Sequence, residues 1–170
     1  MSPAPTSSHQ KISFELSGLI RDSLKGNHCQ AFTAPFDVYF PQYPEQDFNS
    51  INTIVQPDIS VICDPEKIIK KGCLGAPDII FEILSPSTSK KDLNEKFQLY
   101  EKNGVKEYWI VDPGNRYVRV FHLQTKETEA GKYDDGTLIP SADRREENTH
   151  AESLILEGFK VDTIELFKES

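Results

Sequence analysis

The fold is decided by residues 76–86, which read APDIIFEILSP. A short apolar run between two prolines is typical of a buried β-strand. Glu82 interrupts this run, and a carboxylate inside a buried strand is costly unless it meets a cation or a hydrogen-bond partner. Glu82 is therefore the first candidate for a functional residue.

A second strand precedes this one and runs from Pro57-Asp58 to Cys63. If it pairs with residues 78–84 as an antiparallel hairpin around a loop centred near Lys70, its start lies beside the end of the later strand. Asp58 then lies opposite Glu82. Asp78 falls at the far end of the hairpin, about 13 Å from Glu82 at roughly 3.3 Å per residue, so we leave it out of any shared ion site.

The remaining pattern predicts an α/β fold, in which a mixed β-sheet is flanked by helices. Helical spacing of apolar residues and strand-like alternation predict further elements: helices at about 9–25 and 90–102, and strands at 36–40, 106–112, 116–123 and 153–157. The order strand, helix, strand around residues 78–112 places one crossover unit inside the sheet.

The length predicts one domain over residues 1–170. We expect a flexible start at residues 1–8, which are small and rich in proline and serine, and largely polar turns and loops at 124–150.

Two carboxylates at one sheet edge would suit a hard divalent cation. Mg²⁺ (or Mn²⁺) prefers a few carboxylate oxygens together with water and substrate phosphate. We expect Asp58 and Glu82 to hold such an ion with the backbone carbonyl of Ile83. Lys96, on the helix that follows the Glu82 strand, is the candidate for stabilising charge that develops during phosphodiester cleavage.

Other polar residues of this helix are candidates for contacts to nucleic acid. Lys90 and Lys91 would contact phosphate, and Gln98 would lie at the rim of the site. Lys96 lies one turn after Asp92 and one turn before Tyr100, so these three residues share one side of the helix.

Each of these residues also has a structural interpretation. Asp58 and Asp78 each follow a proline and could simply begin a strand. Lys96 could pair with Asp92 at i,i+4. His9 is interpreted as a polar residue at a helix start, with a role at the rim of the site as the lesser alternative. Trp109 is interpreted as core because it lies in a central apolar strand.

The net charge of −8 argues against a nucleic-acid partner, because phosphate binding usually leaves a basic surface. It does not exclude one, since a carboxylate-lined metal site adds negative charge while a local group of lysines binds. No apolar run approaches the roughly 18 residues of a membrane span, and residues 1–8 do not resemble a secretory signal. We therefore expect no membrane contact and a cytoplasmic location.

Three cysteines, Cys29, Cys63 and Cys73, form no CxxC pair and leave one residue over in any disulfide scheme. This count suits a reducing compartment and argues against a zinc knuckle. We expect the cysteines to have a structural role.

The chain resembles a known family over about residues 9–121. The resemblance is carried by QPDISV (56–61), GAPDIIFEILSPST (75–88) and GVKEYWIVDP (104–113), with Asp92, Lys96 and Tyr100 between them. This combined spacing is similar to that of the Uma-two family of bacterial endonuclease-like proteins, which is placed in the PD-(D/E)xK superfamily. The resemblance implies a restriction-endonuclease-like core, a Mg²⁺-type ion and hydrolysis of nucleic-acid phosphodiesters.

Residue by residue, Asp58 matches the aspartate of that motif and Glu82 the acidic residue of the next strand. Leu84 stands where the superfamily has a lysine, and the resemblance suggests that Lys96 replaces it. Family members usually carry a further segment before these motifs, so a shortened start is also expected.

The leading hypothesis is a Mg²⁺-dependent endonuclease that acts on nucleic acid, in the first place DNA, and forms a homodimer. The alternative is a non-catalytic binding or assembly module with a nuclease fold. Leu84 at the lysine position and the acidic balance favour the alternative.

Overall fold

The computed structural model describes residues 6–86, 90–126, 129–141 and 149–168. The side chains of residues 90–92, 125–126 and 129–130 are outside that description. The expected phosphate contacts of Lys90 and Lys91 therefore lie outside the described residues.

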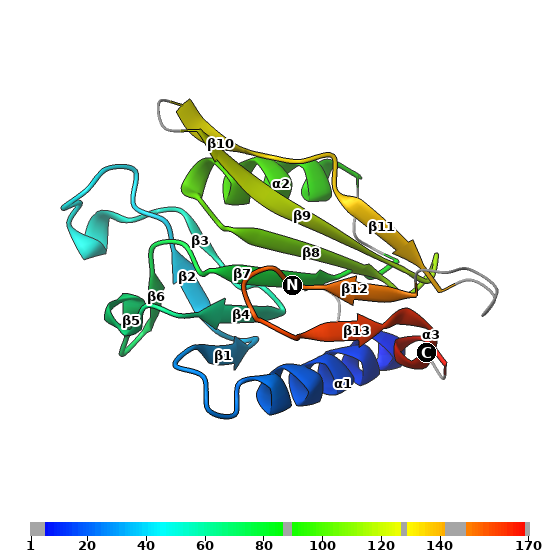
Figure 1. The fold of residues 1–170 in the computed structure, drawn as a ribbon. Helices are drawn as coiled ribbons and strands as arrows, with labels where there is room; N and C mark the ends of the chain where they lie inside the picture. The colour runs from blue at the N-terminus through cyan, green and yellow to red at the C-terminus, as the bar shows by residue number, and fades with distance from the viewer. Residues whose placement is uncertain (1–5, 87–89, 127–128, 142–148, 169–170) are drawn as a thin grey trace.

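A seven-stranded mixed sheet forms the centre of the described part of the chain (Figure 1). Its strands run in the order β1-β4-β7-β8-β9-β10, and β11 also pairs with β9. Their bounds are β1 Gln30–Thr33, β4 Ile59–Ile62, β7 Ile79–Ile83, β8 Glu107–Asp112, β9 Tyr117–Lys126, β10 Glu129–Tyr133 and β11 Thr137–Pro140. Within this sheet β7 and β8 are parallel and the other described pairs are antiparallel. The predicted mixed sheet with a strand-helix-strand unit is confirmed.

Helices and two smaller sheets accompany this sheet. Helix α1 (Ser7–Ser23) precedes it, α2 (Lys90–Asn103) connects β7 to β8, and α3 (Thr163–Leu166) lies near the end of the chain. A four-stranded sheet contains β2 (Asp37–Tyr39), β3 (Ile54–Val55), β5 (Ile68–Ile69) and β6 (Gly72–Leu74), and a two-stranded sheet contains β12 (His150–Glu152) and β13 (Lys160–Asp162). Two 3₁₀ turns cover Phe48–Ser50 and Pro65–Lys67.

Two apolar clusters cover the two faces of the central sheet. Ile12, Leu16 and Ile20 of α1 pack with one set of strand residues, including Phe81 and Trp109. The opposite cluster joins α2 to the other set of strand residues, and it contains Ile80, Tyr100, Tyr108, Ile110 and Phe121. Because successive side chains of a strand alternate between faces, Ile79, Phe81 and Ile83 face the α1 layer and Glu82 faces α2.

Several predicted boundaries are wrong. Helix α1 begins at Ser7, within the start predicted to be flexible, because Thr6 Oγ1 accepts the His9 N–H at 3.2 Å and caps the helix. Most of the described residues between 124 and 150 lie in strands, namely the end of β9, β10 and β11, and not in the turns and loops predicted there. The last predicted strand is displaced: β12 ends at Glu152, and Ser153 Oγ accepts the N–H groups of Ile155 and Leu156 in a turn.

Cys29 and Cys63 form a disulfide, which the reducing compartment suggested by the cysteine count did not predict, and Cys73 is the residue left over, a buried free thiol. The register of β1 with β4, in which Gln30 faces Ile62, brings Cys29 and Cys63 opposite each other. Among the described helices, none is long and apolar enough to cross a bilayer.

Candidate functional site

Asp58 lies at the start of β4, beside the end of β7. The pairing of Ile59 with Phe81 extends by one position to place Asp58 next to Glu82. The Asp58 carboxylate is 19% exposed, and its Oδ2 accepts the backbone N–H of Ile83 at 2.7 Å. The predicted antiparallel hairpin is therefore present, and it holds the Asp58 carboxylate at the end of β7.

Glu82 is buried beneath α2, with 5% of its surface exposed. Its Oε2 accepts from Lys96 Nζ at 2.7 Å, and its Oε1 accepts from the Tyr100 hydroxyl at 2.6 Å. Burial raises the pKa of Glu82 above its usual range, the Lys96 ammonium lowers that pKa, and the nearby Asp58 charge raises it again. The carboxylate is thus tied to α2 by two hydrogen bonds and lies within the field of a second carboxylate.

Helix α2 brings Lys96 and Tyr100 to the same place because residues four apart share one helix side. Lys96 is 37% exposed, so its ammonium reaches both the buried Glu82 and solvent. Burial raises the pKa of Tyr100 and so does Glu82, which keeps the phenol a hydrogen-bond donor. Gln98 is exposed, and it lies about 200° around the helix from Lys96, so it does not join this group.

His9 is a further member of the site, contributed by α1. Its Nε2 lies 3.2 Å from Asp58 Oδ1, and its side chain is 12% exposed. The hydrogen bond to Asp58 raises the pKa of His9 despite an opposing effect of burial, and Glu82 and the backbone carbonyl of Ile83 raise it further. The sequence interpretation favoured a polar helix start for His9 and kept a role at the rim of the site as the lesser alternative, so it did not predict the contact with Asp58. A signal was present, because His9 lies three residues before Ile12 on the helix face that packs on the sheet.

The chemistry of these donors fits a hard divalent cation. The Asp58 carboxylate lies close enough to Glu82 to raise the pKa of Glu82. The Ile83 carbonyl is close enough to His9 to raise the pKa of His9. Oxygen ligands of this kind are what Mg²⁺ and Mn²⁺ prefer, and a cation would offset the repulsion between the two carboxylates.

Asp78 lies at the opposite end of the hairpin and mirrors Asp58. Its Oδ2 accepts the backbone N–H of Cys63 at 2.7 Å, and its Oδ1 accepts from Lys106 Nζ at 2.7 Å. Each Pro-Asp step thus supplies a carboxylate to the end of the neighbouring strand. The two aspartates are structurally matched, but Asp58 has Glu82 beside it.

A cavity of about 680 Å³ is lined by residues that are next in sequence to two members of this group, Ser8 before His9 and Leu84 after Ile83. Leu84, which stands at the position of the motif lysine, forms part of its wall and packs with the cluster beneath α2. The cavity is also lined by Thr6, Ser8, Leu93, Asp112 and Tyr117.

Comparison with known proteins agrees with this architecture. The chain is 29% identical over 157 residues to the uncharacterized protein slr1290 of Synechocystis sp., covering 92% of this chain and 73% of that protein. Its fold is similar to the crystal structure of a nuclease of the DUF820 family from Anabaena variabilis, described as putative, with a TM-score of 0.70 and 22% identity over 98% of this chain and 83% of that one. Residues 1–159 match the model of the Uma2 family, which is described as "Putative restriction endonuclease". The chain therefore belongs to the Uma2 family and has a restriction-endonuclease-like α/β fold.

Proposed function

We propose that this protein is a divalent-metal-dependent endonuclease that hydrolyses phosphodiester bonds, in the first place of DNA. The observation that carries the proposal is the contact of Lys96 with Glu82 at 2.7 Å beside Asp58. Two carboxylates and one ammonium from three separate elements converge, although Leu84 occupies the usual place of the lysine. Membership of the Uma2 family, whose description is "Putative restriction endonuclease", supports the same reaction.

Asp58, Glu82 and the Ile83 carbonyl are the proposed ligands of Mg²⁺ or Mn²⁺. When bound, such a cation would supply positive charge to the scissile phosphate. Asp58 is oriented for this role by the Ile83 N–H and by His9, and Glu82 is oriented by the Tyr100 hydroxyl. We therefore regard His9 and Tyr100 as positioning residues.

Lys96 is the proposed catalytic cation. An ammonium carries three donors, so Lys96 can serve Glu82 and a phosphate oxygen together. Its partial exposure suits this double role, because the substrate must approach from solvent. A preorganised donor aimed at charge that develops in the transition state typically contributes a factor of about 10² to 10³ in rate.

The proposal includes further contacts that extend the site. Lys90 and Lys91 of α2 are proposed to contact the nucleic-acid backbone, which would give a local basic surface in an acidic protein. A homodimer is proposed because a two-fold axis would present two copies of the site to the antiparallel strands of a duplex. Phe14 of α1, 78% exposed, is a candidate for its interface, and light scattering of the purified protein measures the mass. We propose that the protein acts in the cytoplasm.

The test is cleavage of supercoiled plasmid, single-stranded DNA and RNA in Mg²⁺ or Mn²⁺. Asp58→Asn and Glu82→Gln should abolish the cleavage seen with the unchanged protein. Asp78→Asn is the matched control, because Asp78 also follows a proline and also binds the N–H of a neighbouring strand. Intact substrates under every condition would refute the proposal, and so would equal loss of activity in Asp58→Asn and Asp78→Asn.

One observation favours a binding or assembly module instead, namely an apolar Leu84 where the motif has a lysine. Calorimetric titration with Mn²⁺ separates the possibilities when combined with the cleavage assay. Binding that depends on Asp58, without cleavage of any substrate, would support the module.

A further inference from the structure

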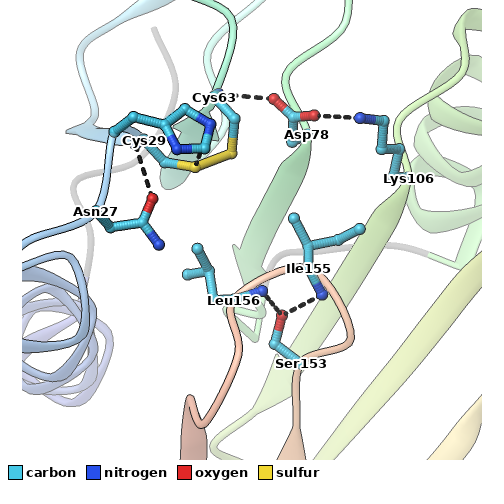
Figure 2. The surroundings of a disulfide bond; sticks show 9 residues. Asn27, Cys29, Cys63, Asp78, Lys106, Ser153, Ile155 and Leu156 are labelled. Carbon is cyan, nitrogen blue, oxygen red and sulfur yellow. Dashed lines mark hydrogen bonds and ion pairs between the residues drawn. A yellow bond between two sulfur atoms is a disulfide. The ribbon is translucent and has the colours of Figure 1, made fainter.

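A second group of ligand atoms lies away from the candidate nuclease site, around the disulfide. Figure 2 shows Cys29 and Cys63 joined through their sulfur atoms, with Asn27 beside Cys29 and Asp78 beside Cys63. His28 Nε2 lies 3.9 Å from Cys29 Sγ, and the ligand atoms of these three residues all lie within 4.8 Å of one another. Among the described residues this is the one group of three metal-binding side chains at such close range.

The backbone around the two cysteines is held by contacts that do not involve sulfur. Asn27 Oδ1 accepts the Cys29 N–H at 3.0 Å, and Asp78 Oδ2 accepts the Cys63 N–H at 2.7 Å. The β1–β4 ladder continues directly from both residues. Breaking the S–S bond therefore leaves two thiols facing each other on a fixed frame, with His28 beside them.

We propose that reduction of this disulfide creates a site for one soft divalent cation of the Zn²⁺ class, held by His28, Cys29 and Cys63. A dithiol reductant gives two electrons and two protons to the S–S bond, becomes a cyclic disulfide, and leaves two Cys thiols. Binding of Zn²⁺ then releases both thiol protons, because the thiolate is the metal ligand. Oxidation and metal binding are thus alternative states of one site.

The observed spacing is close to what a tetrahedral zinc site requires. Zn–S bonds of about 2.3 Å and Zn–N bonds of about 2.0–2.1 Å give an S···N edge of about 3.6 Å and an S···S edge of about 3.8 Å. The S···N separation of 3.9 Å already approaches that edge, and the sulfur atoms separate once the bond is reduced. His28 is exposed, so a water molecule can complete the fourth position.

This site is independent of the proposed nuclease function. Cys63 and Asp58 lie at opposite ends of β4, about 17 Å apart at roughly 3.3 Å per residue. The ligands also differ in kind, since sulfur and imidazole favour Zn²⁺ or Co²⁺ whereas carboxylates favour Mg²⁺. A probe that reports sulfur ligation therefore distinguishes the two.

Co²⁺ is such a probe, because thiolate ligation produces an intense charge-transfer absorption. The full chain is reduced with dithiothreitol, freed of it under argon, and titrated with Co²⁺ beside an oxidised sample. We expect one equivalent to give the absorption in the reduced sample, none in the oxidised sample, and loss of the band when Zn²⁺ is added. Cys29→Ser and Cys63→Ser should abolish the band, and His28→Ala should weaken Co²⁺ binding tenfold or more.

Cys73→Ser is the control. Burial raises the pKa of the Cys73 thiol to about 11, and the thiol donates to the Gly75 carbonyl, so its loss should leave the band unchanged. If a cysteine variant fails to fold, alkylation of the reduced natural chain provides a second measurement, in which Zn²⁺ should protect Cys29 and Cys63 from iodoacetamide. Absence of the band in the reduced protein, its survival in Cys29→Ser, or alkylation unaffected by Zn²⁺ would each overturn the proposal.

Discussion

Replacing Lys96 by methionine tests the candidate site most directly. The change keeps most of the unbranched apolar side chain, but it removes the ammonium that donates to Glu82 at 2.7 Å. Glu82 then keeps the Tyr100 hydroxyl as its partner while it remains buried and close to Asp58. The substitution should therefore affect both stability and catalysis, for separate reasons.

The expected loss of stability follows from the hydrogen bond that Lys96 donates to the charged Glu82 carboxylate. A hydrogen bond to a charged group contributes about 1.5–3 kcal/mol to stability. Lys96 is 37% exposed, so solvent screens its charge, and we expect the lower end of that range, about 1.5 kcal/mol at pH 8. The loss should shrink at low pH, because a protonated Glu82 no longer needs the ammonium.

The sign of the pH dependence follows from the raised pKa of Glu82. A carboxyl group whose folded pKa exceeds its unfolded value, about 4.3, binds more protons in the folded state. Stability therefore falls as pH rises from that value through the folded pKa. Lys96 lowers the pKa of Glu82, so its removal raises this pKa further and steepens the fall.

The assay is urea denaturation in EDTA at pH 5 and pH 8 for the unchanged protein, Lys96→Met, Glu82→Gln and the double variant. This double-mutant cycle should give a coupling energy between Lys96 and Glu82 of about 1.5 kcal/mol at pH 8 and less at pH 5. Cleavage by Lys96→Met should fall about 10²-fold or more while Mn²⁺ affinity stays within about threefold. A coupling energy below about 0.3 kcal/mol, or full cleavage by Lys96→Met, would refute the reasoning.

Three further predictions concern the scaffold. Gly72→Ala should lower the free energy of unfolding, measured in urea, by about 2 kcal/mol or more, because a Cβ there would meet the Asp37 carbonyl oxygen at 2.1 Å and φ is +151°. Unchanged stability would contradict the close approach of β2 and β6. Glu107→Ala should lower the free energy of unfolding by about 3–5 kcal/mol and alter the fluorescence of Trp109, since the buried carboxylate accepts from Trp109 Nε1 and from Ser153 Oγ in the turn after β12. A loss below about 1 kcal/mol would count against this network. Reduction of the Cys29–Cys63 disulfide, whose cysteines are 34 residues apart, should lower the free energy of unfolding by about 4 kcal/mol, because the unfolded chain loses a constraint on its entropy. An identical melting temperature with and without reductant would contradict this prediction.

Local periodicity determined the central part of this protein. The apolar run at residues 79–83, which lies between two prolines, predicted a buried strand, and its pairing with residues 59–62 followed from the short connection between two matching runs. Helical spacing likewise placed Lys96 and Tyr100 on one side of α2. These features depend on residues that are near in sequence or that recur with the fixed period of a helix or strand, so they can be predicted from the sequence pattern.

Other features were decided only when distant segments met in the tertiary structure. His9 reaches Asp58 because α1 docks on the sheet through its apolar face, and Cys29 meets Cys63 because β1 pairs with β4 in one register. Strands β10 and β11 lack a clear alternation. Among their described side chains, Tyr133 of β10 and Ile139 of β11 are buried in the core, and both strands form by completing the hydrogen bonds of β9. Periodicity specifies which face of an element is apolar, but the partner that covers that face is selected by packing across the whole chain.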